Sequence, residues 1–169
     1  MSDQRRRQTR AEPKLSASGL QRSALWHLQR RALTEKELRA LLRRKADRAE
    51  RTHGPSASAA AWIEELLVRL KESLMLDDVR VAEARVATGS ARGNSRRLTA
   101  QRLRQKGIAA DIVASTTANV DDDAAATAYI RRRRLATKDR HKALAALARQ
   151  GFSFEVARRA FDAVAVTTE

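Results

Sequence analysis

Residues 103–113, LRQKGIAADIV, recur 44 positions later as residues 147–157, LARQGFSFEVA. Both copies place a leucine four residues before a glycine, an apolar residue directly after that glycine, and an acid three residues further on. The glycine can adopt the left-handed conformation that ends a helix, and the apolar residue can pack back across the turn. The acid then lies near the positive end of a new helix. Each copy is therefore predicted to be a joint between two helices.

The joint sets the predicted organisation of the whole chain. A weaker third copy lies at residues 42–45, LRRK, where Ala46 stands in place of the glycine. A further helical pattern precedes each joint, at residues 20–31, 78–88 and 123–134. The sequence thus predicts an all-α fold of three tandem three-helix repeats. The expected boundaries are a disordered basic arm over 1–17, a first repeat over 18–76 with an insertion near 46–58, a second over 77–120 and a third over 121–169.

Composition limits both the core and the partners. Lys and Arg number 35 against 20 Asp and Glu, which gives a net charge of +15, so nucleic acid or another anionic surface is the expected partner. Aromatic residues make up only 4% of the chain. A core of Ala, Leu, Val and Ile is therefore expected, and the few aromatics on apolar stripes are assigned to it, namely Trp26, Trp62, Phe152, Phe154 and Phe161. No apolar run reaches the ~20 residues of a membrane span, so a cytoplasmic protein with no membrane partner is expected.

Two cationic clusters are the candidate binding sites. The first has no acid between its ends and comprises Arg92, Arg96, Arg97, Arg102, Arg104 and Lys106. The second comprises Arg131, Arg132, Arg133, Arg134, Lys138, Arg140 and Lys142, with Asp139 among them. Both clusters can also be solvated helix faces; for the second cluster the two interpretations are equally supported, and one or two of its four consecutive arginines are expected at a helix end. The acid-free first cluster slightly favours contact with phosphates or an acidic protein.

Catalytic and cofactor chemistry finds no support in the sequence. The chain has no Cys, and its three histidines, at 27, 53 and 141, are far apart. Two acidic runs, Asp77–Asp78 and residues 121–123, begin predicted helices, where capping explains them. Of the aromatics, only Tyr129 lies near a basic run, so stacking on unpaired bases is not expected. We predict a non-enzyme without a metal or cofactor, and a monomer by default.

The order and spacing of several segments resemble the RecX family, regulators of the RecA recombinase. The opening pattern is similar at residues 24–31, ALWHLQRR, followed by Glu37-Leu38. The middle pattern is similar at residues 76–82, LDDVRVA, and then at Gly93 and residues 103–108. The closing pattern is similar at residues 149–155, RQGFSFE. The resemblance covers nearly everything after the N-terminal arm, with Thr99 standing where the family pattern has an apolar residue.

The resemblance implies three helical repeats in an extended, curved array that binds RecA and RecA–DNA filaments. It implies inhibition of recombinase activities, including ATP hydrolysis, strand exchange and filament extension, and so a role in recombination and DNA repair. The cations would meet phosphates of single- and double-stranded DNA as well as acidic RecA surface. The alternative is a general basic helical protein that binds DNA or RNA without a recombinase partner, which the charge supports equally well.

Overall fold

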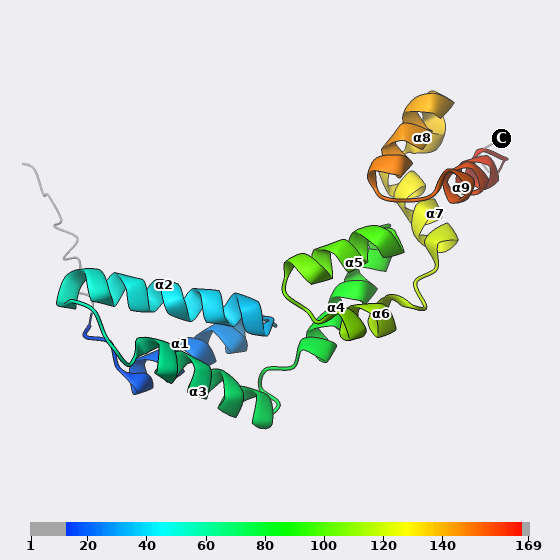
Figure 1. Cartoon of the computed structure of the whole chain (residues 1–169). Coiled ribbons are helices and arrows are strands. Elements are labelled where there is room, and N and C mark those ends of the chain that lie inside the picture. Colours follow the sequence, from blue (N-terminus) through cyan, green and yellow to red (C-terminus); the bar gives the residue numbers. More distant parts are fainter. Residues whose placement is uncertain (1–12, 167–169) are drawn as a thin grey trace, which may run out of the picture. The chain divides into compact units, whose positions relative to one another are not determined.

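A computed structural model describes residues 13–166, and within them the chain is all helical (Figure 1). The helices are α1 Ala17–Arg30, α2 Glu35–His53, α3 Ala59–Glu72, α4 Asp78–Ala91, α5 Arg96–Gln105, α6 Ala110–Thr117, α7 Asp122–Arg133, the short 3₁₀ helix η1 Leu135–Thr137, α8 Arg140–Arg149 and α9 Phe154–Val166. The predicted all-α class is confirmed. Most of the predicted N-terminal arm, residues 1–12, lies outside the described part. No helix within residues 13–166 is long and apolar enough to cross a bilayer.

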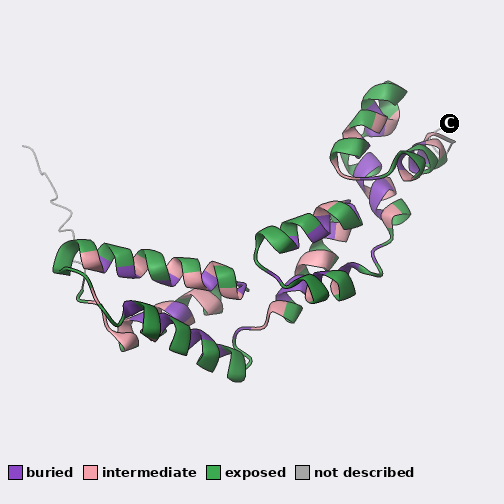
Figure 2. Cartoon of the chain, viewed as in Figure 1, coloured by how far each residue is buried: buried purple, intermediate pink, exposed green. Residues whose placement is uncertain are grey.

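The chain divides into two compact units, the first ending at Leu76 and the second beginning at Asp77, with Thr34–Lys36 grouping with the second. In the first unit α1, α2 and α3 bury a leucine-rich core that includes Leu20, Leu38 and Leu67 (Figure 2). The stretch expected to be an insertion is partly helical, because α2 continues to His53 and buries Ala46 and Ala49 on the way. Gly54, with a φ of 85°, lies just past its end.

The second unit contains two separate core clusters. One lies among α4, α5 and α6 around Ala82, Leu103 and Val113. The other lies among α7, α8 and α9 around Ile130 and Leu147. Short helices with small residues explain this division, since each trio can enclose only a few large side chains. The boundaries of three tandem repeats, and their extended curved arrangement, stay predictions.

The two glycine joints have the geometry that the repeated sequence predicts. After α5, Ile108 N–H donates to the Leu103 carbonyl at 3.2 Å and Gly107, with a φ of 82°, donates to the Arg104 carbonyl. After α8, Phe152 and Gly151 make the same two bonds to Leu147 and Ala148. Such paired bonds close a helix on a left-handed residue.

Two further helices end in the same way without an equally clear sequence signal. After α4, Gly93 donates to Ser90 and Asn94 donates to the Gly89 carbonyl at 2.9 Å. After α3, the left-handed position is filled by Leu74, with a φ of 54°. The joint is therefore used more widely than the repeated sequence indicates.

A pair of side-chain hydrogen bonds occurs twice in the second unit. Ser95 Oγ donates to the Gln150 carbonyl at 2.6 Å, and Arg96 N–H donates to Asp122 Oδ1 at 2.7 Å. In the same manner Thr34 Oγ1 donates to the Lys106 carbonyl at 2.8 Å, and Glu35 N–H donates to Asp78 Oδ1 at 2.9 Å. In both cases a buried hydroxyl satisfies the carbonyl that precedes a joint glycine.

The core assignment of the aromatics is right in part. Phe152 and Phe161 are buried, and Trp62 is half-buried against the first core. Trp26 and Phe154 are wrongly assigned, because their side chains are 52% and 69% exposed. The core face of α1 holds Leu20 and Ala24, and that of α9 holds residues such as Phe161 and Val164, so the Trp26 and Phe154 rings lie outside these faces. Tyr129 is buried and therefore offers no ring to an unpaired base.

Candidate functional site

The first cationic cluster lies on two sides of α5, with Arg92 at the C-terminal cap of α4 and Lys106 at that of α5. The N-terminus of α5 is capped by Ser95, whose Oγ accepts from Leu98 N–H at 3.1 Å. Thr99, Ala100 and Leu103 are buried, and every cation of the cluster is solvent-exposed. Because the buried positions divide the surface of the helix, the cations fall into two groups with different surroundings.

The first group borders a pocket between α4 and α5, which we call the α4/α5 pocket. Its volume is about 470 Å³, and its cations are Arg85, Arg92, Arg102 and Lys106. None of its lining residues is Asp or Glu. In a concave, acid-free site the potentials of the cations add, which favours an anionic group on the ligand.

Polar groups line the α4/α5 pocket beside the cations. Asn94 and Thr99 both lie near Gly89, where an added Cβ would be 3.3 Å from Asn94 Nδ2 and 3.3 Å from Thr99 Oγ1. The buried Thr99 hydroxyl has no hydrogen-bond partner among residues 13–166. A threonine here, where the resemblance to the RecX family implies an apolar residue, thus places this hydroxyl beside the pocket.

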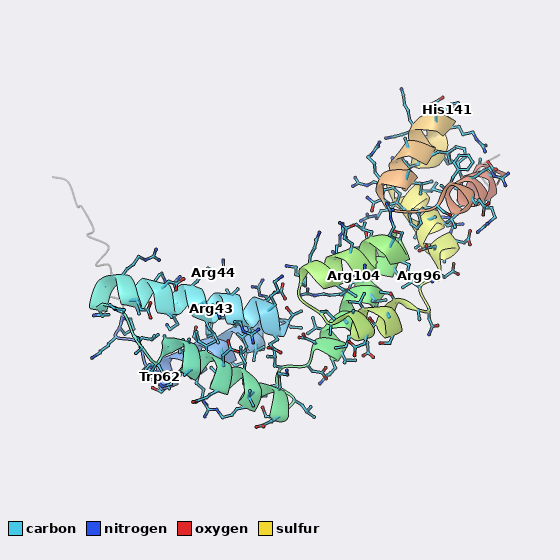
Figure 3. All side chains as sticks on the ribbon, viewed as in Figure 1. Arg43, Arg44, Trp62, Arg96, Arg104 and His141 are labelled. Carbon is cyan, nitrogen blue, oxygen red and sulfur yellow. The ribbon has the colours of Figure 1, made fainter. Side chains whose placement is uncertain are left out.

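The second group has carboxylates beside it. Arg96, Arg97 and Arg104 border a cavity of about 660 Å³ together with residues 121–123, all three of them aspartates. Figure 3 marks Arg96 and Arg104 on α5. The run of sequence that contains no acid is therefore only partly acid-free in space.

The three aspartates have contacts of their own. Asp121 caps α7 by accepting from Asp123 N–H and Ala124 N–H, as predicted. Asp122 accepts from Arg96 N–H. Asp123 pairs with Arg159 at 2.9 Å, and this hydrogen bond and charge raise the pKa of the Arg159 guanidinium. These carboxylates therefore neutralise charge on this side of α5 and serve structure.

The second cationic cluster lies mostly at the end of α7. Residues 131–133 form its last turn and Arg134 follows in the left-handed conformation, which confirms the expectation that some of these arginines lie at a helix end. There they favour the negative end of the helix dipole. Arg140 pairs with Asp162 at 2.6 Å and lies over the Phe161 ring. Lys138 and Lys142 are exposed. Several arginines of this cluster therefore have structural roles, at the end of α7 and in the pair with Asp162.

No metal-binding group of three or more His, Asp or Glu side chains is found among the described residues. His53 and His141 are exposed and His27 is partly so, which agrees with the predicted surface or boundary roles. Asp77 caps α4 by accepting from Val79 N–H and Arg80 N–H, also as predicted.

Two sets of residues were not predicted from the sequence. Arg85 belongs to the α4/α5 pocket, and its signal was the seven-residue spacing to Arg92, two turns along α4. In the first unit, Arg22, Trp26 and Arg30 follow one another at four-residue spacing on α1. That spacing places them on one face of α1. Trp26 was assigned to the core instead, because it also lies on the apolar stripe of the same helix.

Comparisons with known proteins agree on one family. The family model described as "RecX, second three-helix domain" matches residues 77–116, which hold the α4/α5 pocket. "Regulatory protein RecX" of Myxococcus xanthus strain DK1622 is 36% identical over 163 residues, covering 88% of this chain and 87% of that protein. "Regulatory protein RecX" of Agrobacterium fabrum strain C58 is 35% identical over 156 residues, covering 87% of this chain and 82% of that protein. No solved structure gives a significant match. The helical architecture, the glycine joints and relatives that align over most of their length establish that the chain belongs to the RecX family of regulatory proteins.

Proposed function

We propose that this protein binds RecA and RecA–DNA filaments and inhibits recombinase activities, namely ATP hydrolysis, strand exchange and filament extension. The proposed role is binding rather than catalysis, in the cytoplasm with RecA. The α4/α5 pocket is the proposed first contact with an anionic group. The cluster at residues 131–142 is proposed as the second.

One observation carries the assignment of the contact surface, which is that Arg85, Arg92, Arg102 and Lys106 meet around a pocket without a carboxylate in its lining. The segment that forms it coincides with the matched domain of the RecX family. A phosphate of the DNA or an acidic side chain of RecA would accept hydrogen bonds from the exposed Arg92 and Arg102 guanidinium groups. Charge-assisted hydrogen bonds of this kind are shorter and stronger than neutral ones.

Charge and shape have different tasks in this proposal. The net charge of +15 raises the rate of encounter with a polyanionic filament and makes binding sensitive to salt. Phosphate contacts position a protein without selecting a partner. Selectivity for the filament over free DNA therefore has to come from the spacing of the repeats along a periodic partner.

Two charge-reversed double variants test the proposal. R92E/R102E removes two cations of the α4/α5 pocket. R97E/R104E removes two exposed arginines from the aspartate-lined side of α5 and changes the net charge equally. The half-inhibitory concentration in a RecA strand-exchange assay is expected to rise at least ~10-fold for R92E/R102E, since one charge-assisted bond of about 1.5 kcal/mol corresponds to such a factor. R97E/R104E is expected to change it by less than ~3-fold.

Thermal unfolding followed by circular dichroism is the control that tests whether each variant keeps its helices. Equal losses for both variants would mean that overall charge, and not the α4/α5 pocket, sets the inhibition. A loss of free-DNA binding with inhibition intact would move the filament contact to another surface. If the protein is instead a general DNA- or RNA-binding protein, neither the original protein nor either variant is expected to inhibit RecA once free DNA is in excess.

A further inference from the structure

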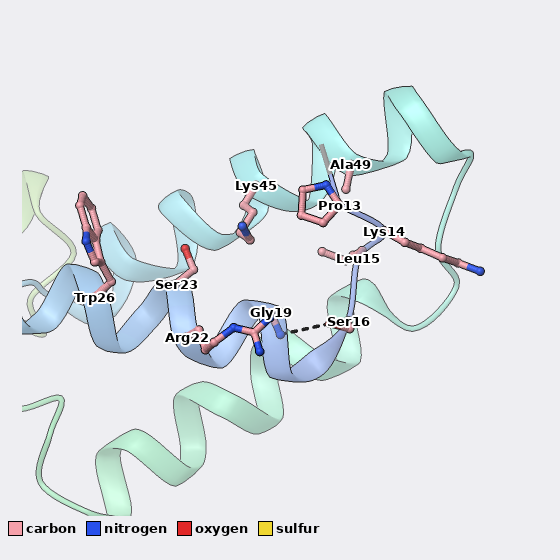
Figure 4. A pocket seen from close by; sticks show the side chains of 10 residues that line it. All are labelled: Pro13, Lys14, Leu15, Ser16, Gly19, Arg22, Ser23, Trp26, Lys45 and Ala49. Carbon is pink, nitrogen blue, oxygen red and sulfur yellow. Dashed lines mark hydrogen bonds between the residues drawn. The ribbon is translucent and has the colours of Figure 1, made fainter. Parts of the chain in front are cut away.

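A second cationic groove lies in the first unit, between α1 and α2 (Figure 4). Its volume is about 310 Å³, and three cations line it, Lys14, Arg22 and Lys45. No Asp or Glu is among its lining residues, and Leu15 and Ala49 give it an apolar base. We call it the α1/α2 groove. It is distinct in residues and in unit from the α4/α5 pocket.

Trp26, a residue that is 52% exposed, lies at one end of the α1/α2 groove. The Arg30 guanidinium lies over its ring, 4.6 Å from the centroid, and the His27 ring meets the indole edge-on at 4.8 Å. Arg22 and Arg30 lie one turn before and one turn after Trp26 on the same face of α1. An indole that keeps half of its surface in water, beside cations and apolar side chains, has the parts of a stacking platform.

The surroundings of Trp26 are positive without any neighbouring carboxylate on α1. Residues 17–30 contain no Asp or Glu. The pKa of His27 is lowered by partial burial and by the charges of Arg31, Arg30 and Lys45. Positive charge and an exposed aromatic ring are therefore found together, whereas a basic surface alone supplies only the charge.

We propose that the α1/α2 groove binds single-stranded nucleic acid, with an unpaired base stacked on Trp26 and the flanking phosphates held by Lys14, Arg22 and Lys45. Stacking needs a base whose face is free, which a duplex does not offer along its length. An acidic peptide would bind the cations but would make no use of the exposed part of the indole. The chain's own first twelve residues carry four Arg against two acids, so charge disfavours them as the occupant.

The first test measures the affinity of the full chain for a labelled oligothymidylate by fluorescence anisotropy. An oligomer of the same length made of abasic nucleotides supplies the phosphates without the bases. The proposal predicts that the abasic oligomer binds about ten-fold more weakly, and that W26L binds both oligomers with this lower affinity. F154L is the matched control, since Phe154 in α9 is another exposed ring and its loss is expected to change neither affinity.

The second test reads the indole directly. In a W62F background Trp26 is the single tryptophan, and oligothymidylate is expected to quench its fluorescence while the abasic oligomer leaves it unchanged. Equal affinity for the two oligomers, or an unchanged affinity in W26L, would overturn the stacking. If polyglutamate competes with oligothymidylate and quenches Trp26 equally, the ligand of the groove is an acidic protein and not nucleic acid. If a duplex binds as tightly as oligothymidylate, stacking of an unpaired base is excluded. None of these outcomes affects the test of the α4/α5 pocket, which is read out by RecA inhibition.

Discussion

Leu74 holds a backbone conformation that glycine holds at the equivalent position of three other joints. Its φ of 54° lies in the left-handed region, as do those of Gly93, Gly107 and Gly151. A side chain in this region costs about 1–2 kcal/mol because Cβ crowds the following carbonyl. Leu74 is 72% exposed, so little burial offsets this cost.

L74G is therefore expected to raise the free energy of unfolding by about 1 kcal/mol, after the greater freedom of glycine in the unfolded chain is subtracted. Urea denaturation measures it. G107A is the opposite control and is expected to lower the stability, since it places a side chain at a φ of 82°. A fall in stability for L74G would mean that Leu74 makes contacts that outweigh its strain.

His27 provides a pH-dependent prediction. Its pKa is lowered from the usual value of 6.5 by partial burial and by nearby cations. Between that lowered value and 6.5 the unfolded chain binds more protons than the folded one, so stability falls as the pH drops through this window. H27Q is expected to flatten this part of the stability–pH curve, measured by urea denaturation from pH 7.5 to 5. An unchanged slope in H27Q, with the exposed His141 replaced as the control, would contradict the assignment.

Some residue conformations and positions could be predicted from the sequence, and others could not. Gly107 and Gly151 predict their joints because glycine reaches the left-handed region at no steric cost. Leu74 gives no such signal, since a leucine is ordinarily helical or extended. Trp26 was misplaced because periodicity identifies a stripe of apolar residues but does not say which member lies at its edge.

At the scale of elements, Ser95 connects the start of α5 with the end of α8. Its buried hydroxyl accepts from Leu98 N–H and donates to the Gln150 carbonyl at 2.6 Å. S95A removes the cap and leaves a carbonyl without its partner, so the free energy of unfolding is expected to fall by about 2 kcal/mol. Thermal or urea unfolding measures it.

Ser153 is the matched control for this variant. Its Oγ caps α9 by accepting from Val156 N–H at 3.3 Å, and it lies exposed on the surface. S153A is expected to cost less than half as much, because only a solvent-exposed cap is lost. Similar costs for the two variants would show that the Ser95–Gln150 bond contributes little.

The starts of helices were predicted correctly where a capping residue marks them. Asp77 and Asp121 were predicted to begin helices, and they cap α4 and α7. The first joint was predicted to lack its glycine and to have extra residues near 46–58, and the first part of this region is helical, because α2 continues through Ala46 and Ala49 to His53, with Gly54 after it. Charged residues between small apolar ones permit a helix as readily as a loop, so only the glycine marked its end.

At the scale of the whole molecule, the charge of +15 was evident from composition, and its distribution was not. The acid-free run at residues 92–106 divides in space, because the aspartates of residues 121–123 lie beside Arg96, Arg97 and Arg104. Only the cations on the opposite side keep an acid-free pocket. Long-range packing brings in charges that lie far away in the sequence, so a local count overestimates the free basic surface.

The central claim is that the protein acts on the RecA filament and does not merely sequester DNA. The most direct measurement is the ATPase rate of RecA on saturating single-stranded DNA, with this protein added well below one copy per RecA and the DNA then raised several-fold. If the protein acts on the filament, inhibition survives the excess DNA. Inhibition that disappears as DNA is added would contradict this action, and the protein would then be a general nucleic-acid binder.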